Sequence, residues 1–188
     1  IIMLNYLIMT PLGKFEIPVS AYKIFLGEWC IDYDDNNLAK NSVIAHYHWD
    51  DRKKLYKDYI YILELYEKLL LRLTKYLNKI HNKNNTIDYW RIIIGPWLLI
   101  FLAVIYDRWK ILENVLNEHK ITDVIVSKEK ICDNEIFNME HFILSIKSDY
   151  WNLGVFSDIL NYRKELKINY HHNNYIKNDL NYPVTNDI

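Results

Sequence analysis

A glycine, a carboxylate and a tryptophan come together directly after the second apolar run of the chain. Residues 25–30 read Phe-Leu-Gly-Glu-Trp-Cys. A strand is predicted to end here, and open α/β sheets bind their ligands at the carboxyl ends of their strands. Glu28 is therefore a candidate general acid or base, and Gly27 allows close approach of the backbone to a ligand. The alternative is a solvated glutamate at a strand end, because one glycine is no nucleotide-binding fingerprint.

The densest polar cluster of the sequence is residues 46–52, which read His-Tyr-His-Trp-Asp-Asp-Arg. In an extended chain His46, His48 and Asp50 share one face, an arrangement that a metal ion could use. We expect no metal here, because the aspartates are needed to cap the helix that follows. Binding of an anionic sugar or phosphate by His48 and Arg52 at the start of that helix is favoured over binding of a metal ion.

A third cluster, residues 89–97, reads Tyr-Trp-Arg-Ile-Ile-Ile-Gly-Pro-Trp. Proline disrupts a helix interior, so the sequence predicts a helix broken at its Gly-Pro pair. Backbone N–H groups freed by the break, together with Arg91, could receive an anion, and Trp90 and Trp97 could stack on a ligand. The alternative is that both tryptophans are packing residues and that Arg91 pairs locally.

Short apolar runs bounded by glycine and proline predict the strands that would position these clusters. Residues 6–10 and 22–26 are two such runs, and residues 121–126 form a third after a helical stretch. Strands that alternate with helices indicate the α/β class.

The helices are predicted from apolar residues at steps of three and four. From Leu55 to Ile80 this spacing predicts one long amphipathic helix over 51–81, capped by Asp50 or Asp51. Thr86 can cap a second helical segment, which runs to the Gly-Pro pair and resumes through residue 116. Two more helices are expected over 133–147 and 150–167.

The stretch 92–106 carries no charge over 15 residues. About 20 apolar residues are needed to cross a bilayer, so we expect a buried core helix without a transmembrane span. Residues 168–188 are rich in asparagine and lack periodicity. The sequence therefore predicts a single α/β domain over 1–167 followed by a polar tail over 168–188, in which His171 and His172 have no role.

Composition excludes several classes of protein. The chain has 188 residues, of which 51% are hydrophobic, and a formal charge of -1, which is typical of a soluble globular domain. No uniform basic field is present to attract nucleic acid, so we expect no nucleic-acid partner.

The two cysteines, Cys30 and Cys132, lack the spacing of a zinc site. This favours a reducing cytoplasmic setting, with Cys30 as a buried apolar residue.

Several blocks together resemble one known family. They are residues 25–30, then His-Trp-Asp-Asp-Arg at 48–52 with Leu-Tyr-Lys-Asp-Tyr at 55–59, then 89–98 followed by Tyr-Asp-Arg at 106–108, and finally Asp-Tyr-Trp-Asn at 149–152. Their order and spacing over about residues 6–165 are similar to those of a family of transferases from bacterial surface-polysaccharide and O-antigen loci, first defined from spirochaetes. The residues at its motif positions include Gly27, Glu28, Trp29, Asp50, Asp51, Arg52, Tyr89, Trp90, Arg91, Gly95, Pro96, Trp97, Asp107 and Arg108.

The resemblance implies a glycosyltransferase-like enzyme of the two-Rossmann GT-B architecture, with this chain as its Rossmann-like, helix-rich amino-terminal domain. Its partners would be an activated sugar donor, a glycan acceptor and a missing carboxyl-terminal domain that holds most of the donor site. We expect no cofactor and a location in the cytoplasm or at the inner face of the membrane, where peripheral contact is expected. The candidate catalytic residue is Glu28, and the candidate substrate-binding residues are Gly27, Trp29, His48, Asp51, Arg52, Trp90, Arg91 and Trp97.

A non-enzymatic module is the competing hypothesis. Such a truncated or split product would bind a partner through its long amphipathic helix 51–81 and the apolar stretch 92–106. Exposed apolar surface and self-association would favour this second hypothesis.

Overall fold

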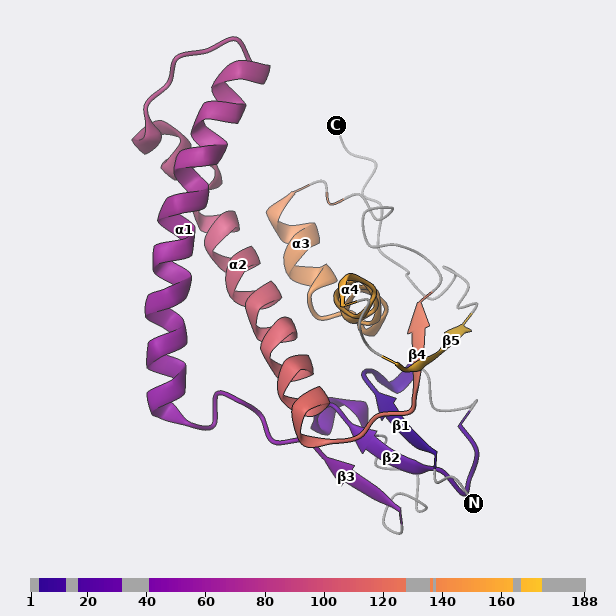
Figure 1. The fold of residues 1–188 in the computed structure, drawn as a ribbon. Helices are drawn as coiled ribbons and strands as arrows, with labels where there is room; N and C mark the ends of the chain where they lie inside the picture. Colours follow the sequence, from indigo (N-terminus) through magenta and orange to yellow (C-terminus); the bar gives the residue numbers. More distant parts are fainter. Residues whose placement is uncertain are drawn as a thin grey trace.

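A five-stranded parallel sheet forms the base of the molecule (Figure 1). The computed structural model describes residues 4–12, 17–31, 41–127, 136, 138–163 and 167–173. The strands lie in the order β3-β2-β1-β4-β5. Their bounds are β1 Asn5–Ile8, β2 Tyr22–Phe25, β3 Ser42–Ile44, β4 Asp123–Ser127 and β5 Asn169–Asn173. The α/β class predicted from the sequence is therefore confirmed.

The central strands are the ones that the apolar runs predicted. Leu7 and Ile8 in β1 and Val124 to Val126 in β4 are buried, as expected for strands in the middle of a parallel sheet. The predictions at 6–10, 22–26 and 121–126 are confirmed to within two residues. The short strand β3 was not predicted.

Strand β5 lies inside the segment that was predicted to be a polar tail. It pairs in parallel with β4 along its whole length, so that prediction is wrong for 169–173, while 174–188 lies outside the described residues. Polar contacts explain how a strand without an apolar pattern joins the sheet. The buried carboxylate of Asp123 lies 2.8 Å from His171 Nε2, and Oδ1 of Asp123 also accepts from the side chain of Asn169 at 3.2 Å.

Two long helices form an antiparallel hairpin between β3 and β4 (Figure 1). Helix α1 spans Arg52–Ile80 and begins at Asp51, whose side chain accepts from two backbone N–H groups. Helix α2 spans Ile87–Glu118 and begins at Thr86, which caps it in the same way. Both predicted caps are confirmed. The helices pack through a shared apolar cluster whose buried members are Ile62, Tyr66, Leu70, Trp90, Leu98 and Leu102.

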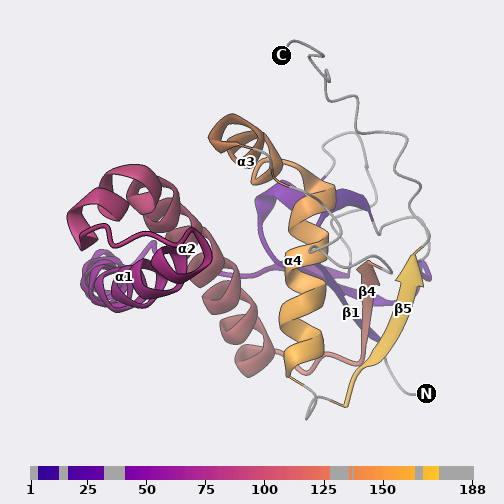
Figure 2. The same cartoon turned by 90° about the horizontal axis from the view of Figure 1, so that it is seen from above.

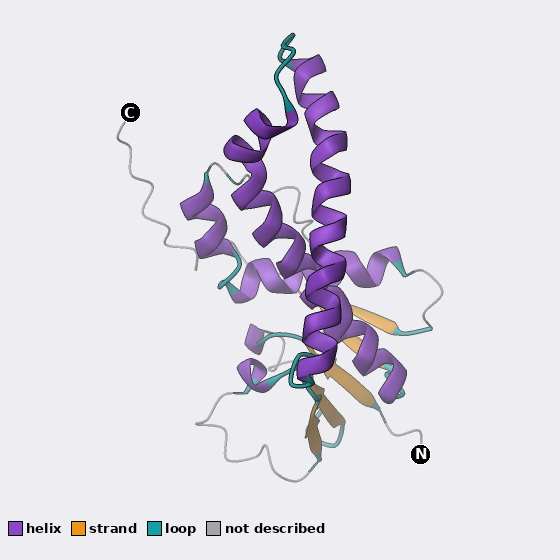
Figure 3. Cartoon of the chain, turned by 90° about the vertical axis from the view of Figure 1, so that its left-hand side faces the viewer, coloured by secondary structure: helices purple, strands orange, loops and turns teal. Residues whose placement is uncertain are grey.

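The predicted break at the Gly-Pro pair is wrong, because α2 continues through Pro96. In Figures 1 and 3 the first part of α2 lies at an angle to the rest, as expected where proline removes one backbone donor without ending the helix. Gly95 has a packing role: a Cβ atom there would lie 2.6 Å from the hydroxyl oxygen of Tyr66 on α1. Because no break frees backbone N–H groups here, the structure removes the geometric reason for expecting an anion site at this position.

Replacing Gly95 by alanine is expected to destabilise the protein by about 1–3 kcal/mol, because the added methyl group collides with the Tyr66 hydroxyl. Alanine is otherwise favoured over glycine in a helix by about 1 kcal/mol. In a Tyr66→Phe background the same substitution should therefore become stabilising. Chemical denaturation of the four proteins of this double-mutant cycle measures both effects. An equal effect of Gly95→Ala in both backgrounds would contradict the steric explanation.

The first part of α2 is less buried than predicted. Leu98 and Leu102 face α1 and are buried, whereas Ile92 and Ile93 on the other side are 77% and 58% exposed. By length and composition alone, α2 is the one helix of the described chain that could cross a membrane, and 22% of its most apolar stretch is buried. The stretch 92–106 therefore belongs to an amphipathic hairpin, and only those of its residues that face α1 or the sheet are buried in a core.

Two shorter helices connect β4 to β5. Helix α3 spans Met139–Ser145 and α4 spans Asp149–Tyr162. Helix α4 packs on β4 and also contacts α2, so that the helices cover one face of the sheet together (Figure 2). The helix predicted over 133–147 is shorter than expected in the described part of the chain, and the one predicted over 150–167 ends at residue 162.

Candidate functional site

A cleft of about 330 Å³ lies where the carboxyl ends of β2 and β3 meet the helices. Parallel strands present such a crevice at their carboxyl ends, and it is the usual ligand position in α/β sheets. One wall comes from the short 3-10 helix η2, Glu28–Cys30, and the opposite wall from the start of α4. The lining residues are Trp29, Tyr47, Asp107, Arg108, Lys147, Asp149, Asn152 and Phe156.

The indole ring of Trp29 forms the apolar wall of this cleft. It is 45% exposed, and its Nε1 donates to the carbonyl oxygen of Met9 at 3.2 Å. The ring lies directly over Gly27, where a Cβ atom would be 2.1 Å from the nearest ring carbon. Gly27 is therefore needed for steric reasons, since its extended backbone (φ -174°) suits any residue.

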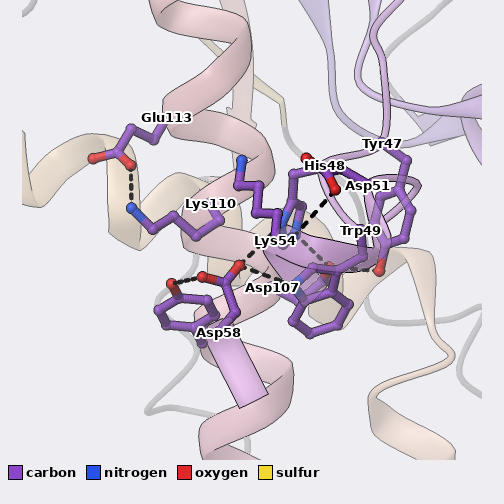
Figure 4. Close-up of polar contacts among 10 residues, drawn as sticks. Tyr47, His48, Trp49, Asp51, Lys54, Asp58, Asp107, Lys110 and Glu113 are labelled. Atoms are coloured by element: carbon purple, nitrogen blue, oxygen red, sulfur yellow. Dashed lines mark hydrogen bonds and ion pairs between the residues drawn. The ribbon is translucent and has the colours of Figure 1, made fainter. Parts of the chain in front are cut away.

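The buried carboxylate of Asp107 accepts from three side chains, two of which, Tyr47 and His48, are drawn in Figure 4. Its Oδ1 accepts from the Tyr47 hydroxyl at 2.8 Å and lies 3.0 Å from His48 Nε2, and its Oδ2 is paired with Arg108. An ionised carboxylate can only accept hydrogen bonds, so Nε2 of His48 carries a hydrogen. These contacts tie the segment after β3 to the middle of α2.

This arrangement keeps Asp107 charged. Burial raises the pKa of Asp107, but the hydrogen bond from His48, the charge of Arg108 and the bond from Tyr47 outweigh burial, so its pKa lies below the ordinary value. Burial, followed by the bond to this carboxylate, raises the pKa of the Tyr47 hydroxyl well above its ordinary value. Asp107 is thus a fixed negative charge that orients its neighbours, and a poor proton acceptor.

Arg108 spans the cleft from α2 to α4. Its Nε donates to Oδ1 of Asn152 at 3.0 Å, while its other end is held by Asp107. Asn152 is fixed in turn, because its amide nitrogen donates to the carbonyl oxygens of Ile146 and Ser148 at 3.0 and 2.9 Å. The guanidinium group is therefore rigidly placed and 24% of the Arg108 side chain remains exposed.

A second buried carboxylate, Asp58, lies on the other side of His48 from Asp107 (Figure 4). It accepts from Trp49 Nε1 at 3.0 Å and from the Tyr106 hydroxyl at 2.7 Å. His48 lies between the two carboxylates, with its Nδ1 3.8 Å from Asp58 and without a hydrogen bond in the described structure. The network joins the start of α1, the strand-end segment and α2, and so supports the back of the cleft.

Besides Gly27 and Trp29, four predicted site residues belong to η2, to the segment after β3 and to the start of α1, and none of the four lines the cleft. Glu28 is exposed and directly precedes Trp29 in η2. His48 is 4% exposed, so it acts on the cleft through Asp107 and not by direct contact. Asp51 caps α1 with its carboxylate, and Arg52 is an exposed residue in the first turn of the same helix.

Three other predicted residues lie in the helical hairpin, where they have partners of their own. Trp90 is buried and donates to the Asn78 side chain at 2.9 Å. Arg91 makes two hydrogen bonds to Glu67, at 2.6 and 2.9 Å. Trp97 stacks on Phe101 at 5.1 Å between ring centroids and is not a cleft residue. The structure does not bring these three together with Gly27 and Trp29.

Sequence reasoning missed much of the polar side of the cleft. Tyr47, Lys147, Asp149 and Asn152 were not proposed as site residues, and Asp107 with Arg108 was named only among the family's motif positions. One signal was available, since that pair ends a long uncharged stretch and belongs to the family blocks. Cys30 is buried as predicted, with its thiol 3.3 Å from the Ile8 carbonyl oxygen, whereas Cys132 lies outside the described residues. In the described ranges, no group of three histidine, cysteine or acidic residues could hold a metal ion.

Comparison with known proteins gives one match. The family model described as LIC12162 family transferase matches residues 5–185. No curated protein and no solved structure matches the chain. The matched range includes every strand and helix described above, together with the complete cleft. The chain therefore belongs to the LIC12162 family of transferases.

Proposed function

We propose that this chain is part of a glycosyltransferase-like enzyme of the GT-B type that transfers a sugar from an activated donor to a glycan acceptor. The pathway would be the assembly of a bacterial surface polysaccharide of the O-antigen or capsule type. Membership of a transferase family supports the group-transfer reaction. The parallel strand order β3-β2-β1-β4-β5 supports a Rossmann-like domain, because it is the order of the first five strands of the doubly wound sheet.

The composition of the cleft is the observation that carries the proposal. A sugar ring has an apolar face of C–H groups and a rim of hydroxyl groups. The exposed Trp29 ring suits the apolar face, and the side chains of Arg108, Lys147 and Asn152 offer hydrogen-bond partners for the hydroxyl rim. Two cations and the carboxylates of Asp107 and Asp149 line the cleft, so its formal charges balance. This balance favours a saccharide over a polyphosphate.

In this proposal the chain supplies the acceptor side of the enzyme, and a further domain supplies most of the donor site. Glu28 would be the general base for an acceptor hydroxyl, because it directly precedes Trp29 at the carboxyl end of β2. The donor diphosphate would be stabilised by helix N-termini and basic groups, without a metal ion. The reaction would take place in the cytoplasm, at the inner face of the membrane.

The test is a transfer assay with the complete native protein, a panel of nucleotide sugars and surface glycan from the source cell. We expect one donor to label the glycan, with turnover lowered by about 100-fold in a Glu28→Gln variant. Unchanged labelling in the presence of a chelator would agree with a metal-independent site. If no donor labels the glycan and no saccharide binds the protein, the proposed function is wrong. Ordinary turnover in Glu28→Gln would remove only the role of Glu28.

The second candidate is a partner-binding module without catalysis. It is favoured by one observation, the exposed apolar side of α2, which includes Ile92, Ile93 and Tyr89. Exposed apolar patches of this kind commonly mark interaction sites. Sedimentation velocity distinguishes the two candidates: self-association of a protein that binds no saccharide would support the module, whereas a monomer that binds saccharide would support the enzyme.

A further inference from the structure

Helix α1 has a net positive charge, unlike the chain as a whole. Its 29 residues include eight basic and three acidic side chains, a formal charge of +5, whereas the whole chain carries -1. Two of the three acidic side chains have partners outside α1: Asp58 accepts from Trp49 and Tyr106, and Glu67 pairs with Arg91. The charge of the helix is therefore not neutralised within the hairpin.

Six of the basic residues lie on one side of the helix, which we call the basic face of α1: Lys54, Lys57, Lys68, Arg72, Lys75 and Lys79. Their spacing of three, four or eleven residues places them on one line along the helix. Five of them are exposed and Lys54 is half-buried. None of the six makes an ion pair within the part of the chain that the structure describes.

From Lys68 to Lys79 this face points away from the rest of the molecule, whereas nearer the start of the helix Asp58 and Tyr61 contact Tyr106 of α2. The buried residues of α1 that meet α2 are Ile62, Tyr66 and Leu70, on the opposite side of the helix from the basic face. Figure 3 shows α1 as the outermost element of the hairpin, free of covering helices over its length. At 1.5 Å per residue, the basic face extends over about 38 Å from Lys54 to Lys79. A long, straight row of cations suits contact with a flat surface.

Apolar side chains are interleaved with these cations. Leu71 and Tyr76 flank the line of basic residues and are 49% and 60% exposed, whereas Tyr61 on the line itself packs beside Tyr106 of α2. A helix with basic residues on its polar face and exposed aromatic and aliphatic side chains beside them is typical of binding in the plane of a bilayer interface. The cations of this face could also pair with the phosphates of a nucleic acid. A nucleic acid, however, has no apolar layer into which Leu71 could insert.

We propose that the basic face of α1 docks the protein on a membrane surface that contains anionic lipids. The lysine and arginine side chains contact lipid phosphates, and Leu71 and Tyr76 enter the boundary between headgroups and acyl chains. This proposal does not depend on the transferase reaction, because binding to vesicles is measured without donor or acceptor.

The experiment is flotation of the full chain with vesicles of phosphatidylcholine, with and without phosphatidylglycerol. Each lysine or arginine near an anionic surface strengthens partitioning by roughly fivefold. A Lys68→Gln/Arg72→Gln/Lys75→Gln variant should therefore bind the anionic vesicles on the order of 100-fold more weakly. The matched control, Lys23→Gln/Lys120→Gln/Lys167→Gln, removes the same charge from other parts of the molecule and should bind like the wild type. Circular dichroism confirms that both variants keep their helices.

Two further measurements use proteins with an unaltered set of charges. Binding of the wild type should weaken steeply as salt is raised, because the Debye length falls from about 10 Å at 0.1 M to 3 Å at 1 M. A Leu71→Ser variant should also bind more weakly, which a purely electrostatic contact would not predict. Equal binding to both kinds of vesicle, an equal loss in the control variant, or binding to duplex DNA without binding to vesicles would each overturn the proposal.

Discussion

Replacement of Asp107 by alanine is expected to lower the free energy of unfolding by about 3–5 kcal/mol, the usual result of removing one partner from a buried ionic contact. Asp107 is 5% exposed and accepts from Tyr47, His48 and Arg108. Its loss leaves the half-buried Tyr47 hydroxyl and the buried His48 imidazole without this acceptor, and it removes the acceptor at one end of the Arg108 guanidinium group. Arg108 would also lose one of the two contacts that hold it across the cleft.

Urea denaturation measures this effect, and its dependence on pH provides an internal check. The pKa of Asp107 in the folded protein lies below its unfolded value, so its contribution is complete above the unfolded pKa of about 3.9. The contribution is lost as the pH falls through the folded value. The difference between wild type and Asp107→Ala should therefore be constant near neutral pH and shrink in acid.

Asp88→Ala is the matched control, because the Asp88 side chain is 83% exposed on the same helix. Its effect should stay within about 0.5 kcal/mol. Asp107→Asn keeps one acceptor oxygen and should fall between the two variants. A loss no larger for Asp107→Ala than for Asp88→Ala would show that the network does not stabilise the fold.

The helices and central strands could be predicted because their patterns are local. The spacing from Leu55 to Ile80 follows the face of α1 that meets α2, and Asp51 and Thr86 cap the helices through their own backbone neighbours. Strand β5 could not be predicted in this way. Its partners are Asp123 and the backbone of β4, more than 40 residues earlier in the chain, and its own sequence has no apolar alternation.

The Gly-Pro pair shows where a local rule fails. Proline removes one hydrogen bond, but the packing of Trp90 on one side of the pair and Leu98 on the other against α1 holds both parts of α2 in one helix. The rule that proline ends a helix considers only the backbone. Burial of these side chains against α1 outweighs the cost of the lost backbone hydrogen bond. Without a break, the geometric reason for expecting an anion site here is lost.

The candidate site was only partly predictable, because its polar residues come from distant segments. Trp29 was found from its place after a strand, a local feature. His48 and Asp107 are 59 positions apart, and Arg108 and Asn152 are 44 apart. Only the packing of α2 against α4 and against the segment after β3 brings them together. Conversely, the sequence suggested that Arg91 was free to bind an anion, because its partner Glu67 lies 24 positions away on the other helix.

Replacement of Trp29 by alanine is expected to weaken saccharide binding by roughly 30-fold or more, since truncating an aromatic anchor in a binding site commonly costs 2 kcal/mol or more. The Trp29 ring is the exposed apolar wall of the cleft, whereas Phe156, which also lines it, is only 1% exposed. Trp29→Phe keeps an aromatic face and should retain most of the affinity. Calorimetric titration with fragments of the native glycan measures these changes.

Gly27→Ala provides an independent route to the same result. The added methyl group would lie 2.1 Å from the present position of the Trp29 ring, so the ring must move away although its chemistry is unchanged. Binding should therefore weaken in Gly27→Ala nearly as much as in Trp29→Ala. Tyr56→Ala, which removes an aromatic ring that is 66% exposed on α1, should leave affinity unchanged. Full affinity in both cleft variants would show that the saccharide does not stack on Trp29, and the acceptor site would have to be sought elsewhere on the molecule.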